Sequence, residues 1–421
     1  MELLIRSATI VHQGSPFHLQ KKDIYISDGV IVKIEDKVDI KDKKKVQVIE
    51  EKNLHVSSGW FDMKANFCDP GFEQKEDLFT GMDAAAAGGF TGVLVMPSTK
   101  PDIQNKSGVE YLIHKSRGKA VDIFPAGALT VDRQGNDLTE MYDMKLSGSL
   151  AFTDDKRTVA DAGVMLRALL YGRQIDSLII SFAQDKGIAG KSLVNESTNT
   201  TKLGLKGIPS LAEEMIVSRD LSLCEYAGGR IHFSLISTAG AVDMIRQAKK
   251  KGMKVSADVS AYHLCLDDSM LETFDTNLKT NPPLRSAKDI ESLIKGLADG
   301  TIDAIVSDHC PQDVENKRVE FDFAGYGMVG LETAFAVANT VLKSRMKTEQ
   351  IIQKFTAGRT IAGLKANSIA ENEPANLTLF NPGTEWVFSE TDLKSKSSNT
   401  PFIGKKLTGR TIGIINNGIY R

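Results

Sequence analysis

The sequence predicts an α/β fold, a (β/α)8 TIM barrel with a small β-sandwich-like domain built from both termini. Short apolar stretches that end in polar loops recur through residues 56–365 and alternate with helical stretches. About eight such strand-then-helix units in roughly 300 residues are typical of this barrel. Alternating apolar and polar residues mark both ends of the chain, so residues 1–55 and 366–421 are predicted to be two parts of one β domain.

The N-terminal part alternates apolar and polar residues at 2–11, 23–35 and 46–51. Asp28-Gly29 lies inside the second stretch, and this dipeptide favours a tight hairpin turn. The opening residues, MELLIRSATIV, predict a strand rather than a signal peptide.

The barrel region then begins with a helical stretch at 76–89, which is rich in alanine and closed by two glycines. An apolar strand is predicted at 90–99. Six further apolar stretches are predicted as strands: 121–129, 147–155, 177–185, 229–238, 254–264 and 302–311. Helices are predicted between several of them, as at 240–252 and 286–300. In such barrels the loops at the C-terminal ends of the strands carry the chemistry.

Near the C-terminus, strand-like alternation returns at 375–382, 384–389 and 410–421. Asn417-Gly418 supplies a second tight-turn dipeptide inside the last stretch. These strands are expected to join the N-terminal strands in one small β domain.

Composition limits the classes of partner. The chain has 421 residues, and its formal net charge of −2 gives no indication of a nucleic-acid or membrane partner. Four cysteines without a CxxC spacing argue against a disulfide framework and favour a reducing cytoplasm. No apolar run approaches the length of a membrane span.

Taken by themselves, the strand-end loops offer carboxylates but few imidazoles. No two of the seven histidines lie at the i,i+2 or i,i+4 spacing that aims two imidazoles at one ion. Part of a zinc site could come from Asp154, Asp308, Cys68 and Cys310, with His263 or His309. The alternative is that these are ordinary loop residues. No serine or cysteine nucleophile with a partnered base can be placed.

Six segments, in order along the chain, resemble dihydroorotases of the cyclic amidohydrolase superfamily: residues 69–101, 203–220, 237–252, 281–311, 327–334 and 395–410. The resemblance covers nearly the whole chain. It implies the barrel with its flanking β domain and a homodimer. It also implies kinship to the enzyme that interconverts L-dihydroorotate and N-carbamoyl-L-aspartate in pyrimidine biosynthesis.

Seven positions at which the resemblance implies a metal ligand or a substrate contact carry other residues: Lys64, Asn66, Cys68, Ser98, Phe182, Leu235 and Gln312. The first three replace a His-x-His-x-Arg motif that supplies two zinc ligands and a substrate arginine. Phe182 and Leu235 replace the two other histidine ligands. Ser98 replaces a loop asparagine, and Gln312 replaces a histidine after the last barrel strand.

Three positions keep the residue that the resemblance implies. Asp154 corresponds to an aspartate ligand of one branch of the family, Asp308 to the catalytic general base, and Asn281 to a substrate contact. Two aspartates without imidazoles retain too few ligands for a tight zinc site, and a cysteine cannot replace a bidentate arginine. No cofactor is therefore predicted.

Lys64 suggests a substitute for the missing cation. Two carboxylates that converge at the barrel mouth repel each other unless a positive charge lies between them. We therefore expect Lys64 to form a salt bridge with Asp308 or Asp154, the alternative being a lysine that reaches solvent.

These observations favour a non-catalytic dihydroorotase homologue that is retained as a structural or regulatory partner. The resemblance implies aspartate carbamoyltransferase as its candidate partner. One alternative is an active dihydroorotase or related cyclic-amide hydrolase that binds zinc, with a site rebuilt from Asp154, Asp308, Cys68, Cys310 and Lys64. Another is a small-molecule sensor that uses the old pocket.

Overall fold

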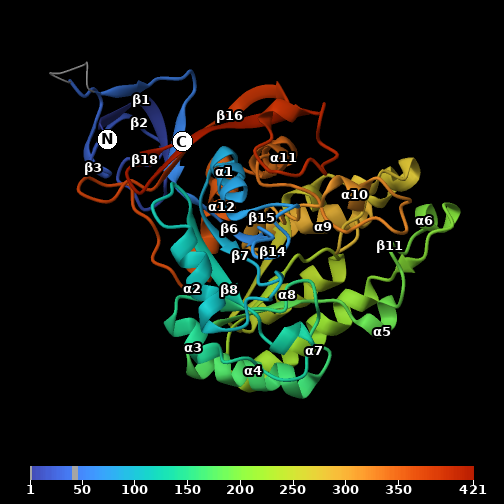
Figure 1. Ribbon diagram of the computed structural model, residues 1–421. Coiled ribbons are helices and arrows are strands. Elements are labelled where there is room, and N and C mark those ends of the chain that lie inside the picture. The colour runs from blue at the N-terminus through green and yellow to red at the C-terminus, as the bar shows by residue number, and fades with distance from the viewer. Residues whose placement is uncertain (1, 40–45) are drawn as a thin grey trace.

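A computed structural model describes residues 2–39 and 46–421, and its centre is a parallel barrel (Figure 1). Eight strands follow one another around it in chain order: β6 (Trp60–Ala65), β7 (Phe90–Val95), β8 (Asp122–Gly127), β9 (Ala151–Phe152), β10 (Leu178–Phe182), β13 (Ile231–Ser234), β14 (Val255–Ser260) and β15 (Ala304–Val306). A parallel bridge between Ala65 and His309 closes the ring, and the Asn66 N–H donates to the His309 carbonyl at 2.8 Å. The predicted barrel is confirmed.

Helices surround the barrel and connect its strands: α1 (Leu78–Gly88), α2 (Lys106–Lys115), α3 (Met141–Leu146), α4 (Ala162–Gln174), α7 (Leu211–Ala227), α8 (Ala239–Lys250), α9 (Ala287–Ala298), α11 (Ala334–Leu342) and α12 (Thr348–Ile361). Helices α8 and α9 lie within two residues of the predicted stretches.

Helix α1 shows why these segments are helical. Asp77 caps its first turn by accepting the N–H groups of Phe79 and Thr80, both at 3.0 Å. Gly89 ends it with a φ of 92°, a left-handed conformation that glycine adopts without strain. The run of small residues also allows close packing, because a Cβ at Gly88 would lie 2.2 Å from the Leu331 carbonyl oxygen.

Several strands are shorter than the sequence predicts, because the chain turns away early to build the loops of the barrel mouth. The stretch 147–155 forms a strand only at Ala151–Phe152, and Asp155 has a left-handed φ of 57°. The stretch 254–264 ends in a 3-10 helix, η2 (Ala261–Leu264). The connections also hold short elements that the sequence did not predict: α5 (Lys186–Ala189), β11 (Val194–Asn195), α6 (Thr198–Lys202), β12 (Gly207–Ile208), α10 (Val314–Lys317), η1 (Val131–Arg133), η3 (Asp268–Thr273), η4 (Thr276–Leu278) and η5 (Glu390–Asp392).

The second large sheet combines the two ends of the chain in the order β18-β17-β16-β5-β1-β2-β3, with β4 beside β1. Its strands are β1 (Glu2–Val11), β2 (Lys21–Ser27), β3 (Val30–Glu35), β4 (Gln47–Ile49), β5 (His55–Ser58), β16 (Leu377–Val387), β17 (Lys406–Asn416) and β18 (Ile419–Tyr420). Both tight turns form as predicted, with positive φ at Asp28-Gly29 and Asn417-Gly418. The two stretches predicted at 375–389 are one strand, whose register shifts between Asn381 and Glu385.

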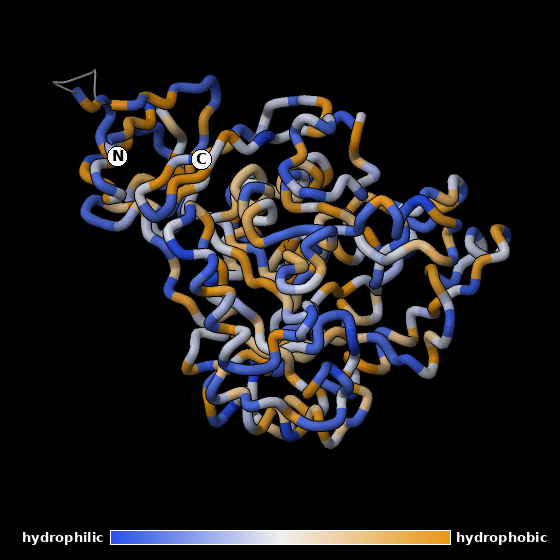
Figure 2. Tube along the Cα trace, in the orientation of Figure 1, coloured by the Kyte–Doolittle hydropathy of each residue, from blue (hydrophilic) through white to orange (hydrophobic). Residues whose placement is uncertain are grey.

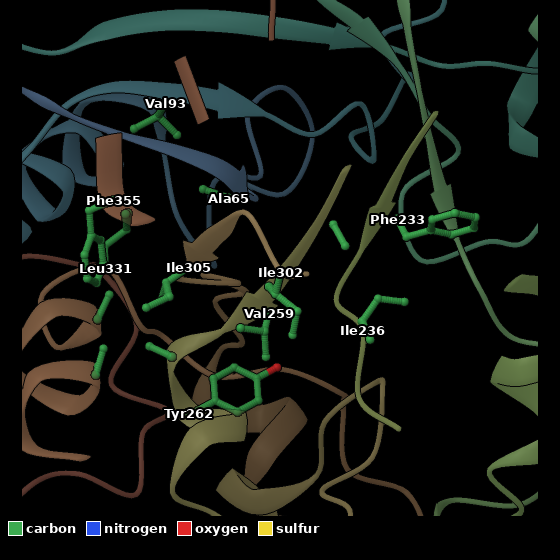
Figure 3. Close-up of a cluster of buried hydrophobic side chains, with 14 of the residues drawn as sticks. Ala65, Val93, Phe233, Ile236, Val259, Tyr262, Ile302, Ile305, Leu331 and Phe355 are labelled. Carbon is green, nitrogen blue, oxygen red and sulfur yellow. The ribbon is translucent and has the colours of Figure 1, made fainter. Parts of the chain in front are cut away.

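Apolar side chains fill the space between barrel and helices. Figure 3 shows Ile305 of β15 beside Leu331 and Phe355 of α12, and all three are buried. A separate apolar cluster fills the barrel interior and includes Phe61, Met63 and Met96. Hydrophilic residues are frequent along the outer segments (Figure 2). Within residues 2–39 and 46–421, no helix has the length and apolar character needed to span a membrane.

Asp62 links the first barrel strand to Ser307, which follows the last barrel strand. Its carboxylate accepts the Ser307 N–H at 3.1 Å, the Lys64 N–H at 3.3 Å and the Ser307 hydroxyl. Burial raises the pKa of Asp62 to about 7. A neutral, hydrogen-bonded acid is therefore favoured at this seam of the barrel.

An Asp62→Asn variant should gain stability relative to the wild-type protein as the pH rises. The folded protein holds a proton up to about pH 7 that the unfolded chain loses near 3.8. Wild-type stability should therefore fall across this window, by up to about 1.4 kcal/mol per pH unit, whereas asparagine does not titrate. Urea unfolding from about pH 5 to about pH 8 measures the difference, and a constant difference would contradict the assignment.

Candidate functional site at the barrel mouth

The candidate site lies where the barrel strands end at their carboxyl side, the face that carries the chemistry in this fold. Lys64 belongs to β6, and Asp155 and Asp308 follow β9 and β15. All three side chains are buried, and Lys64 is only 2% exposed. Charged side chains this deeply buried need partners of opposite charge.

The first cluster of the mouth is centred on the Asp155 carboxylate. Lys64 Nζ forms a direct ion pair with Asp155 Oδ1. On the other carboxylate oxygen, Asn66 Nδ2 donates at 3.0 Å, and the Ser98 hydroxyl donates as well. Asn66 also donates to Ser98 Oγ at 2.7 Å. Three of the seven substituted positions, Lys64, Asn66 and Ser98, therefore converge on one carboxylate.

The second cluster is centred on Asp308. Lys156 Nζ lies 2.7 Å from Asp308 Oδ2, and the Tyr262 hydroxyl donates to the same oxygen. Burial raises the pKa of Tyr262, so its hydroxyl remains a donor. Among the described residues, Asp308 Oδ1 and the Oδ1 atoms of Asn66 and Asn281 have no hydrogen-bond partner.

Asp154 does not face the mouth as its neighbour does. Its carboxylate accepts the N–H groups of Leu129 at 3.0 Å and Thr130 at 2.9 Å, together with the Thr130 hydroxyl. It braces the loop after β8. The left-handed conformation of Asp155 turns the next side chain inward instead, so the carboxylate at the mouth is Asp155.

The predicted salt bridge of Lys64 with Asp154 or Asp308 is therefore wrong in its partner. Lys64 is buried and paired, as expected of a substitute cation, but it contacts Asp155. Asp308 is instead paired with Lys156, a residue that was not predicted to belong to the site. The signal was available in the run Asp154-Asp155-Lys156, where a lysine follows two carboxylates at a strand end.

The other substituted positions do not join these two clusters. Phe182 and Leu235 are buried in the apolar cluster of the barrel interior. Cys68 is buried, and burial raises the pKa of its thiol, so it stays protonated. Gln312 holds loops together, because it accepts from Lys75 Nζ at 2.9 Å and donates to the Tyr326 carbonyl at 2.9 Å.

His232 and His263 both have hydrogen-bond partners within the protein. His232 contacts Ser256 Oγ at 2.8 Å and Asp258 Oδ2 at 2.9 Å. His263 contacts Ser260 Oγ at 2.6 Å and the Pro283 carbonyl at 3.2 Å. Burial lowers the pKa of His263 to about 4, which keeps its imidazole neutral.

The donor set at the mouth does not fit zinc. Zinc sites are built from imidazole, thiolate and carboxylate ligands that converge on one point. Across residues 2–39 and 46–421, no three or more His, Cys, Asp or Glu side chains are grouped so as to hold a metal ion. The carboxylates of Asp155 and Asp308 are each engaged by an ammonium group, which occupies the place of a positive partner.

Comparison with known proteins gives a consistent family. Residues 55–241 match the family model described as Dihydro-orotase-like. The chain is 38% identical over 423 residues to the dihydroorotase of Carboxydothermus hydrogenoformans, covering 100% of this chain and 97% of the relative. It is 40% identical over 375 residues to the dihydroorotase of Geotalea daltonii, covering 88% of each chain.

Solved structures show the same fold at lower identity. The L-hydantoinase (dihydropyrimidinase) from Arthrobacter aurescens superposes with a TM-score of 0.86 at 20% identity, covering 100% of this chain and 95% of that chain. The dihydropyrimidinase from Brevibacillus agri gives a TM-score of 0.83 at 22% identity, with the same coverage.

Removing the Lys64 ammonium should destabilise the protein strongly. In Lys64→Met the Asp155 carboxylate stays buried without its cation, and we expect a loss of about 3–5 kcal/mol in the free energy of unfolding. The double variant Lys64→Met/Asp155→Asn removes both charges and should lose less than the two single variants together. Urea unfolding of the four proteins measures this coupling.

Lys106→Met is the matched control, because Lys106 is 63% exposed and its pairing with Glu110 spans 3.6 Å at the surface. It should change stability by less than about 0.5 kcal/mol. An equally small effect of Lys64→Met would show that the buried pair does not stabilise the mouth.

Proposed function

The chain belongs to the dihydroorotase-like family, and from this premise we propose that it is a non-catalytic member that acts as a structural or regulatory partner. The observation that supports this most directly is the pair of lysine–carboxylate contacts at the mouth, Lys64 with Asp155 and Lys156 with Asp308. We also propose that the protein is a cytoplasmic homodimer and that aspartate carbamoyltransferase is its partner.

Hydrolysis of a cyclic amide needs a nucleophile and a group that polarises the carbonyl. A bound zinc ion supplies both, by lowering the pKa of its water and by acting as a Lewis acid. The positions at which the family resemblance implies zinc-binding histidines hold Lys64, Asn66, Phe182 and Leu235 in this chain, and these residues offer no imidazole. Without a metal, these side chains provide neither function.

The remaining catalytic candidates are also engaged. Asp308, at the general-base position, is paired with Lys156 and accepts the Tyr262 hydroxyl, so two partners already occupy its Oδ2 atom. Cys68 stands at the position of the substrate arginine, and a protonated thiol gives no bidentate contact to a carboxylate. Asn281 keeps a free carbonyl oxygen, which alone supports substrate contact but not turnover.

A structural or regulatory role is supported by what the chain retains. The barrel, the β domain and the packed core are complete across the described residues, while the substitutions gather at the mouth. A fold kept intact without its reactive groups fits a protein that is used for its surface. Family resemblance supplies aspartate carbamoyltransferase as the candidate.

The second candidate function is an active dihydroorotase or related cyclic-amide hydrolase with a rebuilt site. Its support is the 38–40% identity to proteins named dihydroorotase over nearly the full chain. Asp308 Oδ1 and Asn281 Oδ1, which have no hydrogen-bond partner, are groups that such a site could offer to a ligand.

Metal content and turnover separate the two functions. Protein purified without chelator should hold well under one zinc per chain, should melt at the same temperature after EDTA treatment, and should not hydrolyse L-dihydroorotate. Stoichiometric zinc, together with turnover that is abolished in Asp308→Ala, would establish the enzyme and overturn the proposal.

The partner is tested with aspartate carbamoyltransferase from the same organism. We expect the two proteins to co-elute in size-exclusion chromatography at micromolar concentration, and the mixture to have a larger mass than either alone by light scattering. Separate elution at concentrations of about 10 μM and above, where interfaces with micromolar Kd associate, would exclude this partner.

A further inference from the structure

The outer face of helix α7 carries a stripe of exposed, uncharged side chains. Leu211 is 52% exposed, Met215 51% and Tyr226 79%. Ser218 and Ser222 lie between them and are also exposed. Because residues three and four positions apart share one helix face, these five side chains form a single row along the helix. We call them the α7 stripe.

Two neighbouring charged residues, Arg219 and Glu214, point away from the α7 stripe, whereas Glu225 is exposed beside Tyr226 at the edge of the stripe. Arg219 donates to the carbonyls of Val159 at 2.9 Å and Ala160 at 2.8 Å, at the start of helix α4. Glu214 lies against the first turn of α8, since a Cβ at Gly240 would be 2.2 Å from its Oε1. Ser222 donates its hydroxyl back to the Ser218 carbonyl at 3.1 Å. The row therefore has large, mainly apolar side chains toward its two ends and small serine side chains between them.

The inner side of α7 is held rigidly in the barrel wall. Glu213 accepts the N–H groups of Ser237 at 2.9 Å and Thr238 at 3.0 Å. Asp220 accepts the Ser181 hydroxyl at 2.7 Å. Helices α4 and α8 pack on either side of α7, and α4 and α7 lie at the end of the molecule away from the β domain (Figure 1). The stripe is thus presented on a fixed element.

The order of side chains in the stripe is self-complementary. Leu211 and Tyr226 lie at equal distances from the midpoint between residues 218 and 219, and so do Met215 and Ser222. In an antiparallel pair of α7 helices related by a two-fold axis at this midpoint, Met215 of each copy covers Ser222 of the other. Leu211 then lies beside Tyr226, and two small Ser218 side chains meet at the axis, where helices must approach to 8–10 Å.

We propose that the α7 stripe is the centre of an interface with a second copy of this chain. This inference deepens the proposal of a homodimer by locating its two-fold axis beside Ser218. It does not depend on whether the barrel mouth is catalytic.

The size of the interface requires the flanking helices. Helix α7 has 17 residues and is about 25 Å long, so at a width of about 10 Å it offers only roughly 250 Å². A stable dimer buries about 800 Å² per partner. By the same estimate the three adjacent helices α4, α7 and α8 offer roughly 630 Å², which is most of that area, and Leu170 on α4 adds an apolar side chain that is 38% exposed.

Cysteine cross-linking tests the position of the axis. The Ser218→Cys variant should form a disulfide-linked dimer rapidly under mild oxidant, because the two residues meet at the axis. Met215→Cys alone should not, since its two copies are about 10 Å apart along the helices, and Ser222→Cys alone should not for the same reason. A mixture of Met215→Cys with Ser222→Cys should cross-link.

Leu146→Cys on helix α3, at a site 69% exposed, is the control for random collision. The wild-type protein is the control for the native cysteines, of which Cys224 on α7 is buried. Cross-linking of Ser218→Cys no faster than Leu146→Cys, in protein that light scattering shows to be dimeric, would overturn the α7 interface and leave the homodimer standing. A monomeric mass at all concentrations would overturn both.

A charge placed on the stripe gives an independent readout. Met215→Glu should weaken the dimer at least about tenfold, measured as the dissociation constant by analytical ultracentrifugation, because each copy then buries a carboxylate against the other. Leu146→Glu should leave it unchanged. Circular dichroism confirms that both variants are folded, and an unchanged dissociation constant in folded Met215→Glu would overturn the interface.

Discussion

Two carboxylates buried at the mouth of the barrel set the constraint on which the rest of the site depends. Asp155 and Asp308 lie at the ends of different strands, where water cannot screen their charges, and each isolated charge would cost several kcal/mol. Lys64 is paired with Asp155 and Lys156 with Asp308, and burial lowers the pKa of Lys64 to about 7. These two contacts join side chains from different strand ends at the barrel mouth.

The substitutions at the mouth form one physical set. Asn66 and Ser98 are donors that complete the shell of Asp155, while Phe182 and Leu235 extend the apolar interior of the barrel toward the mouth. Gln312 and Cys68 are held by neighbouring loops or buried. On our proposal, each of these residues stands where the family resemblance implies a metal ligand or a substrate contact. The outer helices, by contrast, keep an apolar surface at α7 that the fold itself does not cover.

The sequence predicted the barrel well because its signals are local and repeated. Apolar stretches, turn dipeptides such as Asp28-Gly29 and capped helices such as α1 specify their own structure. The C-terminal ends of the strands were harder to predict. At Asp155 and at η2 the chain leaves the strand through backbone conformations that depend on tertiary contacts. The pairings at the barrel mouth were not predicted. Whether Asp154 or Asp155 faces inward depends on one left-handed φ, and Lys156 reaches Asp308 across 152 positions of sequence.

Anomalous diffraction is the most direct test of whether Lys64 and Lys156 take the place of a metal cation at the barrel mouth. Crystals of the protein grown with zinc in excess should be measured at the zinc absorption edge. The account predicts no anomalous peak at the barrel mouth, with Lys64 Nζ in contact with Asp155 and Lys156 Nζ in contact with Asp308. A strong peak between these carboxylates, with the two lysines displaced from them, would contradict it.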